Sequence, residues 1–192
     1  MKIDKAPKLT NPVMIDRVLA CIQDALIDRV GWLDYAFGRA QRLVTKREQR
    51  DHYYPGVYIK KNEYLNVLPG QGLGNRTFFM VDDPHTIDYN PRRYNTIRSP
   101  FSLVLWYDIR TILGASEERN TEEIKRQILR VLTDVVLPGG TRIELNRIYE
   151  TAENIYKGYS LKEIDTQFLM HPFGGLRIEG TIIYREECLW QK

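Results

Sequence analysis

Two short stretches of the sequence hold residue types that are common in binding and catalytic sites. The first, residues 69–75, contains glycines at positions 70, 72 and 74. A dinucleotide-binding loop needs glycine at its first, third and sixth positions, followed by a helix whose N-terminus faces the phosphates. The sixth position here is Asn75, and the residues after it favour a strand. We therefore expect a structural or interaction loop rather than a phosphate site.

The second stretch gathers carboxylates and an imidazole within seven residues: Asp82, Asp83, His85 and Asp88. Such a set could hold a hard divalent cation. Aspartates in a proline-containing loop more often hydrogen-bond their own backbone, so turn chemistry is the favoured interpretation and a metal-dependent enzyme is the lesser alternative. The histidines lack zinc-protease spacing, and no serine has the glycines of a nucleophile elbow. We expect no enzymatic activity, catalytic residue, cofactor or metal.

A third stretch, residues 39–50, is basic. Its cations are Arg39, Arg42, Lys46, Arg47 and Arg50. Facing a phosphate backbone, they would give salt-dependent, non-specific affinity, so a nucleic-acid-binding module is an alternative function. Glu48 and Asp51 dilute this charge, and no aromatic stacking platform accompanies it. A solvated or subunit-facing arm is the favoured interpretation.

Tyrosine is the unusual count in the composition, with 12 residues among 192. Tyrosine and arginine are enriched at protein interfaces, and both occur in or beside the basic stretch and again in the polar segment 82–100. A segment of that length without regular structure suggests a functional loop. The predicted interface residues are Arg39, Arg42, Arg47, Arg50, Tyr53, Tyr54, Tyr89, Arg92, Arg93 and Tyr94.

The elements that must position these segments follow from apolar periodicity. Apolar residues recur every four positions from Met14 to Val30, which predicts a helix over 12–30 that begins at Asn11-Pro12. Residues 101–112 alternate and are apolar on both faces at their start, which is typical of a central strand. Further predicted elements are strands over 57–61, 76–81 and 176–186, and helices over 121–136 and 151–158.

Between these elements, residues 32–56 are expected to form an extended arm or a long hairpin, whereas 142–149 are ambiguous. The pattern predicts a single α+β domain over residues 1–192. It combines a mainly antiparallel sheet with an N-terminal helix, a crossing helix and a closing C-terminal strand. Extended segments are expected near 32–56 and 82–100.

Composition and charge favour a soluble globular protein over a membrane-spanning or secreted one. Hydrophobic residues make up 43% and charged residues 28%, and the net charge is +3, as in an ordinary soluble globular protein. No window approaches the ~18 apolar residues of a membrane span, and residues 1–10 lack the apolar core of a signal peptide. Cys21 and Cys188 lack metal-ligand spacing, and Cys21 is expected to be a buried thiol in the first helix. We expect synthesis in the cytoplasm and no membrane partner.

The order of elements resembles a known family. It shows an opening helix over 12–30, an extended arm, a strand over 101–112, a helix over 121–136, and the entry Pro-Phe-Gly-Gly-Leu-Arg-Ile-Glu-Gly at 172–180 into a final strand. In this order the chain is similar to the tail-terminator and tail-completion proteins of tailed bacteriophages, at the junction of head and tail. It departs from compact members of that family in its long segments 39–50 and 82–100.

The resemblance implies a structural protein of the virion neck or tail, made in the host bacterial cytoplasm. Such proteins form homo-oligomeric rings, have no catalytic residues, and contact neck, portal-side or tail-tube proteins through their loops. Genomic DNA would meet the ring only in transit through its channel. High tyrosine content and long segments agree with this role, because a ring subunit needs heterologous interfaces on two sides.

Overall fold

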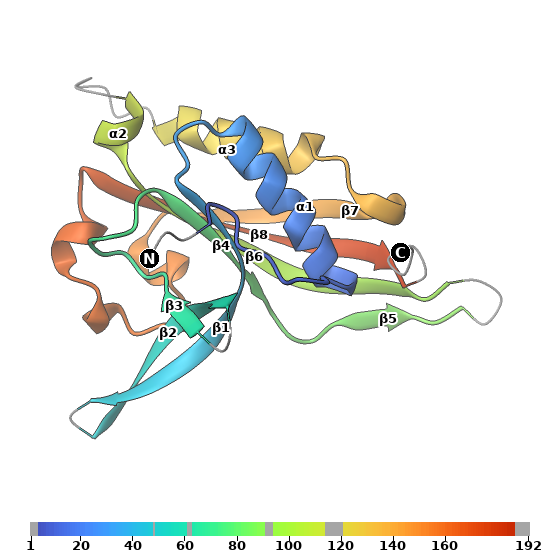
Figure 1. Cartoon of the computed structure of the whole chain (residues 1–192), viewed down its shortest axis with the longest axis horizontal. Coiled ribbons are helices and arrows are strands. Elements are labelled where there is room, and N and C mark those ends of the chain that lie inside the picture. The colour runs from blue at the N-terminus through green and yellow to red at the C-terminus, as the bar shows by residue number, and fades with distance from the viewer. Residues whose placement is uncertain (1–3, 48, 61–62, 91–93, 114–120, 187–192) are drawn as a thin grey trace.

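The computed structural model describes residues 4–47, 49–60, 63–90, 94–113 and 121–186 (Figure 1). Most of the described strands belong to one continuous sheet. The helices are α1 Met14–Arg29, α2 Ile109–Leu113, α3 Thr121–Asp134 and α4 Ala152–Ile155. The strands are β1 Tyr35–Arg47, β2 Arg50–Lys60, β3 Glu63–Asn66, β4 Arg76–Val81, β5 Thr86–Asp88, β6 Thr96–Asp108, β7 Arg142–Tyr149 and β8 Phe173–Arg185. Short 3-10 turns lie at Pro138–Gly140, Leu161–Glu163 and Thr166–Leu169.

The sheet has the strand order β3-β2-β1-β4-β6-β8-β7. β5 pairs with β6 on the same side as β4, at β6 residues that β4 does not reach. β1 and β4 are parallel, whereas the other described pairs are antiparallel. β8 pairs with β6 along its whole length, from Phe173 opposite Asp108 to Arg185 opposite Thr96. The predicted α+β class, with a mainly antiparallel sheet, an N-terminal helix and a closing C-terminal strand, is confirmed.

Each face of the sheet buries its own apolar cluster. α1 and α3 cover one face, as Figure 1 shows, where they pack on Leu103 and Leu105 of β6. The opposite face carries Val104 and Trp106 against α4 and the 3-10 turns that precede β8. Alternate side chains of a strand point to opposite faces, so a strand that is apolar at every position needs cover on both sides. The sequence-based interpretation of this strand as central is confirmed.

β1 and β2 form a long hairpin that leaves the body of the molecule (Figure 1). Their pairing runs from Ala40 opposite Val57 to Arg47 opposite Arg50. The pairing of β1 with β4 shifts register between Ala36 and Arg39 and ends there, so the rest of β1 continues without β4. The extended segment predicted for 32–56 is therefore a hairpin with regular pairing.

Other predictions need correction. The segment 82–100 is more regular than expected, because β5 and the first residues of β6 form a second hairpin within it. α1 begins with Val13 as its N-cap instead of Asn11, and Cys21 is half-buried. The strand expected over 101–112 starts earlier, at Thr96, and gives way to α2 after Asp108.

Candidate assembly interface

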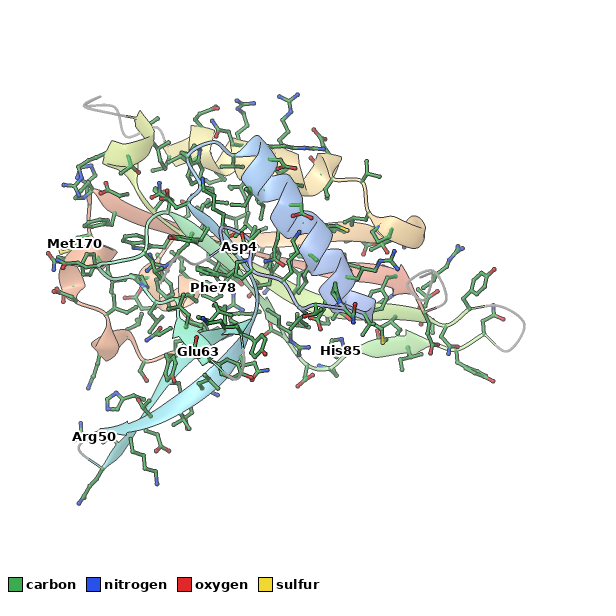
Figure 2. All side chains as sticks on the ribbon, viewed as in Figure 1. Asp4, Arg50, Glu63, Phe78, His85 and Met170 are labelled. Atoms are coloured by element: carbon green, nitrogen blue, oxygen red, sulfur yellow. The ribbon has the colours of Figure 1, made fainter. Side chains whose placement is uncertain are left out.

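The β1–β2 hairpin beyond Gln41 and Pro55, called the arm below, presents exposed cations, and Asp51 lies opposite Lys46 in the strand pairing. The Arg42 guanidinium lies 3.9 Å from the ring centroid of Tyr53, a cation–π contact across the two strands. Lys46 and Arg50 are exposed, with Arg50 near the end of the arm (Figure 2). Within the described residues, none of these three cations has a carboxylate at ion-pair distance.

Cations on the body of the molecule contrast with those of the arm. Arg177 is 5% exposed and lies 3.0 Å from a carboxylate oxygen of Glu179. Arg110 is exposed, but its Nη2 lies 2.7 Å from Oδ2 of Asp108, and this guanidinium lowers the pKa of the Asp108 carboxyl. These two cations of the body are neutralised locally, whereas those of the arm are not.

The base of the arm is fixed to the body. The Tyr53 amide donates to Oγ of Ser160 over 2.9 Å, and the Ser160 amide donates to the Tyr53 carbonyl over 2.9 Å. Ser160 therefore uses its hydroxyl on β2 and does not cap the helical turn that follows it. Tyr54 is half-buried against the second apolar cluster. Tyr53 and Tyr54 were both predicted to be interface residues. In the structure, Tyr53 holds the arm to the body through its main chain, and Tyr54 does so through its half-buried side chain.

Arg39 lies at the other end of this hairpin, beside α1. It is exposed and faces Asp16, whose pKa is raised by burial, while the charge of Arg39 opposes that rise. Both residues line a pocket of about 490 Å³ between the N-terminal segment, α1 and the two strands. The side chain of Arg47 lies outside the described residues.

The β5–β6 hairpin is the second candidate surface, and it exposes Thr86, Asp88 and Asn90 as well as three apolar or aromatic side chains. Ile87 is 62% exposed, Tyr89 75% and Tyr94 39%. The Arg185 guanidinium lies 5.8 Å from the ring centroid of Tyr94. Arg92 and Arg93, predicted to belong to this surface, lie outside the described residues.

The structure does not bring the predicted interface residues into one site. The arm and the β5–β6 hairpin extend from the body in different directions (Figure 1). Arg42, Arg50, Tyr53 and Tyr54 belong to the first surface, and Tyr89 and Tyr94 belong to the second. The predicted interface residues therefore lie on two separated candidate surfaces.

A pocket of about 730 Å³ beside the glycine-rich loop was not identified from the sequence. The rings of Trp106 and Phe173 stack in it with centroids 5.2 Å apart, and Phe168 meets each of them edge-on, at 6.2 and 5.3 Å. Met170 is 60% exposed on the lining, at one end of the molecule (Figure 2). This aromatic socket, defined by Trp106, Phe168, Met170 and Phe173, is a preformed apolar depression.

Two buried polar residues hold the loop beside the socket. Arg76 is 1% exposed, and its guanidinium lies 4.5 Å from the Trp106 ring. It donates to four main-chain carbonyls, those of Val67 (3.0 Å), Leu73 (2.8 Å), Gly74 (3.0 Å) and Leu68. Burial lowers the pKa of Arg76 to about 10, so its side chain is charged at neutral pH.

Asn75 is the second of these residues and is 2% exposed. Its side-chain amide donates to the Trp32 carbonyl (2.9 Å) and to Oγ1 of Thr111 (2.8 Å), and its side-chain oxygen accepts from the Asp108 amide (2.8 Å). The loop is therefore a rigid wall of the socket, and β4 follows it directly. An arginine at the start of an apolar strand, directly after a glycine-rich loop, was the sequence signal for this arrangement.

The carboxylates that suggested a metal site do not converge, although Oδ1 of Asp83 lies 3.8 Å from Nε2 of His85. Asp82 accepts from Oγ of Ser102 (3.3 Å), and His85 Nδ1 lies 2.6 Å from Oγ of Ser99. Asp88 pairs with Arg98 at 3.5 Å. In the described part of the chain, no group of three or more His, Cys, Asp or Glu side chains is placed to hold a metal ion.

Comparison with known proteins assigns no family. A scan against protein-family models gives no match for this chain, and neither does a search of curated proteins. None of the helices in the described ranges is long and apolar enough to cross a membrane.

Proposed function

We propose that this chain is a structural protein of a tailed-bacteriophage virion. Its role is that of a ring-forming tail terminator or head-to-tail connector subunit in the neck or tail. The observation that carries the proposal is the pair of hairpins, which extend in different directions from one packed body and differ in chemistry. A subunit that meets neighbours on two sides through different surfaces forms heterologous contacts, and these generate closed rings when the rotation closes.

The chemistry of the hairpins supports the same role. Arginine and tyrosine are among the residues that supply most of the binding energy in protein interfaces; the arm presents arginine, and the β5–β6 hairpin presents tyrosine. The partners would be further copies of the chain and proteins of the neck, the portal side or the tail tube. With a net charge of only +3, the subunit suits a channel that genomic DNA crosses without being retained.

The test is the mass and shape of the purified protein. Light scattering coupled to size exclusion, followed by negative-stain microscopy, is expected to show a ring several times heavier than the 22.6 kDa chain. If the rings form only on a template, the protein is expected to join purified tails that lack their terminal ring. A chain that stays at 22.6 kDa and joins no virion component contradicts the proposal.

A second candidate function rests on the cations of the arm that lack carboxylate partners. A module that binds nucleic acid through residues 39–50 would lose affinity steeply with salt, with a slope of about −0.9 per phosphate contact. Replacing Arg42 and Lys46 by alanine is expected to lower that slope by about two. Arg130→Ala is the matched control, because that exposed arginine lies on α3 beside Asp134. Absent or salt-insensitive binding removes this candidate.

A further inference from the structure

β1 has a free edge along the arm. Its pairing with β4 ends at Arg39, and the arm then extends away from β4 (Figure 1). β2 pairs with one side of these β1 residues, as far as Arg47 opposite Arg50. No described strand pairs with the other side of β1 between Arg42 and Lys46. An unpaired strand edge is a template on which an extended chain can add a further strand.

Hydrogen bonds at the base of the arm show which main-chain groups this edge offers. In an antiparallel pair, two opposite residues either exchange both main-chain hydrogen bonds or direct them away from each other. Tyr53 directs its amide and carbonyl to Ser160, away from β1, so its partner Val44 directs its own away from β2. Arg42 and Lys46, two residues to either side of Val44, share this orientation. Within the described residues, none of the three makes a main-chain hydrogen bond outside the hairpin.

The space beside the edge is open at its base. The pocket of about 490 Å³ next to α1 lies where β1 and β4 separate, because Arg42 of β1 and Val81 of β4 both line it. The charged residues of its lining are Lys8, Asp16, Arg39 and Arg42. Lys8 pairs with Asp24, and Arg39 faces Asp16, whereas Arg42 has no carboxylate partner among the described residues. A strand added to β1 therefore finds an open, positively charged depression beside Arg42.

The side chains next to the free edge are positively charged or neutral. β1 contains no acidic residue. Arg42, Val44 and Lys46 point to one face, where both cations are exposed and Val44 is 53% exposed. Asp51 lies opposite Lys46 on β2, one strand further from the edge. A strand added at the edge therefore has a cation, an apolar side chain and a second cation as its direct neighbours on this face.

A second copy of β1 does not suit this edge. Because β1 has no acidic residue, no register of two β1 edges places a carboxylate opposite a cation. The antiparallel register that is symmetric about Val44 places Arg42 of each copy opposite Lys46 of the other. Like charges directly opposite each other destabilise a sheet, whereas opposite charges stabilise it. The edge thus opposes pairing with itself and favours an acidic strand.

We propose that the free edge of β1 binds an extended acidic segment of another protein, which adds to the arm as a further strand. The main chain of that segment bonds to Arg42, Val44 and Lys46. Its side chains follow the order acidic, any, apolar, any, acidic, which is the same in parallel and antiparallel orientation. In this sequence that order with an apolar centre occurs only at residues 24–28, within α1, so the partner is a different protein. The inference goes beyond the proposed function and does not depend on ring formation.

The first test uses peptides that separate charge from main-chain pairing. The probe is a short fluorescent peptide with Glu-Thr-Val-Thr-Glu at its centre, and the control peptide has Lys-Thr-Val-Thr-Lys there. Fluorescence anisotropy is expected to show saturable binding of the acidic peptide, and binding of the basic peptide that is weaker by a factor of about ten.

N-methylation of the acidic peptide tests the main-chain hydrogen bonds. One version is methylated at the valine amide and another at the two threonine amides. In an antiparallel complex the valine amide faces Val44, and in a parallel complex the threonine amides flank it. One version is therefore expected to bind like the parent peptide and the other more weakly by a factor of about ten, which also gives the orientation of the strand.

Variants of the protein test the same edge. Val44→Pro removes an amide that points away from β2, so the hairpin keeps its own hydrogen bonds while the edge loses a donor. Arg42→Glu combined with Lys46→Glu is expected to reverse the preference between the acidic and basic peptides. Arg130→Glu is the control, because this exposed arginine lies on α3, and it should bind the acidic peptide as the wild type does. Circular dichroism checks that each variant is folded.

Three results would overturn the inference. The first is an acidic peptide that does not bind saturably, or equal binding of the acidic and basic peptides or of the two methylated ones. The second is a DNA oligonucleotide that binds the arm while the acidic peptide does not, which assigns the cations to nucleic acid. The third is self-association of the wild type that Val44→Pro abolishes and Arg130→Glu preserves, which assigns the edge to a second copy.

Discussion

Asn75 holds together the end of the sheet that carries the aromatic socket, and Asn75→Ala tests this directly. The alanine removes three hydrogen bonds of 2.8–2.9 Å, to the Trp32 carbonyl, the Thr111 hydroxyl and the Asp108 amide. Thr111 retains a partner, because its hydroxyl also donates to the Asp108 carbonyl over 2.8 Å. Two main-chain groups, the Trp32 carbonyl and the Asp108 amide, therefore lose the partner that Asn75 supplied.

The expected destabilisation follows from those two groups. A buried polar group left without a partner costs about 1–3 kcal/mol, so the free energy of unfolding should fall by about 2–6 kcal/mol. Urea denaturation followed by tryptophan fluorescence measures this. For a slope of about 2 kcal/mol per molar urea, the midpoint falls by about 1–3 M.

Asn154→Ala is the control for this measurement. That asparagine is exposed, and its side-chain amide donates to the Thr151 hydroxyl over 2.9 Å, so the expected change is within about 0.5 kcal/mol. If the Asn75 and Asn154 variants have equal midpoints, then Asn75 does not hold this end of the sheet. The assignment of the loop as a rigid wall of the socket would fail with it.

Three further predictions test other parts of the fold. Gly180→Ala places a Cβ 2.5 Å from the Glu144 carbonyl oxygen and should lower the free energy of unfolding, measured in urea, by about 1–3 kcal/mol. The control Gly31→Ala meets no atom within 4 Å and should leave that free energy unchanged, so equal losses would contradict the packing. Burial raises the pKa of Tyr107 and Tyr159 to about 12, so the unfolded chain deprotonates these groups first. Their joint contribution to stability is constant below about pH 10 and is lost between about pH 10 and 12, and this loss exceeds the opposing gain from Arg76, whose pKa burial lowers to about 10. Equal unfolding midpoints at about pH 9 and 11 would refute this. Gln23→Ala removes the bonds from its amide to the Pro7 and Ala36 carbonyls, so hydrogen exchange should speed up in residues 4–8 but not in a Gln41→Ala control.

The long elements of this fold are predictable from sequence because burial imposes a period on them. α1 and α3 each bury one side, and the apolar residues of β8 alternate along one face, so the spacing of apolar residues reveals all three elements. β6 buries both sides and shows this as an uninterrupted apolar run. Local sequence is enough for such elements.

Short edge strands do not show such an apolar pattern. β5 is exposed at all three residues, and β3 has one half-buried residue among four, so neither shows an alternating apolar pattern. β7 was ambiguous for a related reason, because most of its side chains are exposed at the edge of the sheet. Their existence depends on pairing with strands elsewhere in the chain.

The candidate surfaces also differ in whether the sequence predicts them. The arm and the second hairpin were found by composition, because arginine and tyrosine gather in continuous segments. The socket was not found, because Trp106 and Phe168 are 62 residues apart in sequence. Their rings meet only after β8 pairs with β6 and brings Phe173 beside Trp106.

The place of β8 in the sheet links the completion of synthesis to assembly. β8 lies between β6 and β7 although it is the last described strand in the chain. A nascent chain that stops before residue 173 leaves one edge of β6 unpaired along its whole length. It also lacks Phe173, whose ring stacks on Trp106 in the socket. On the proposed function, an incomplete translation product would therefore fail to join a ring, without any separate proofreading step.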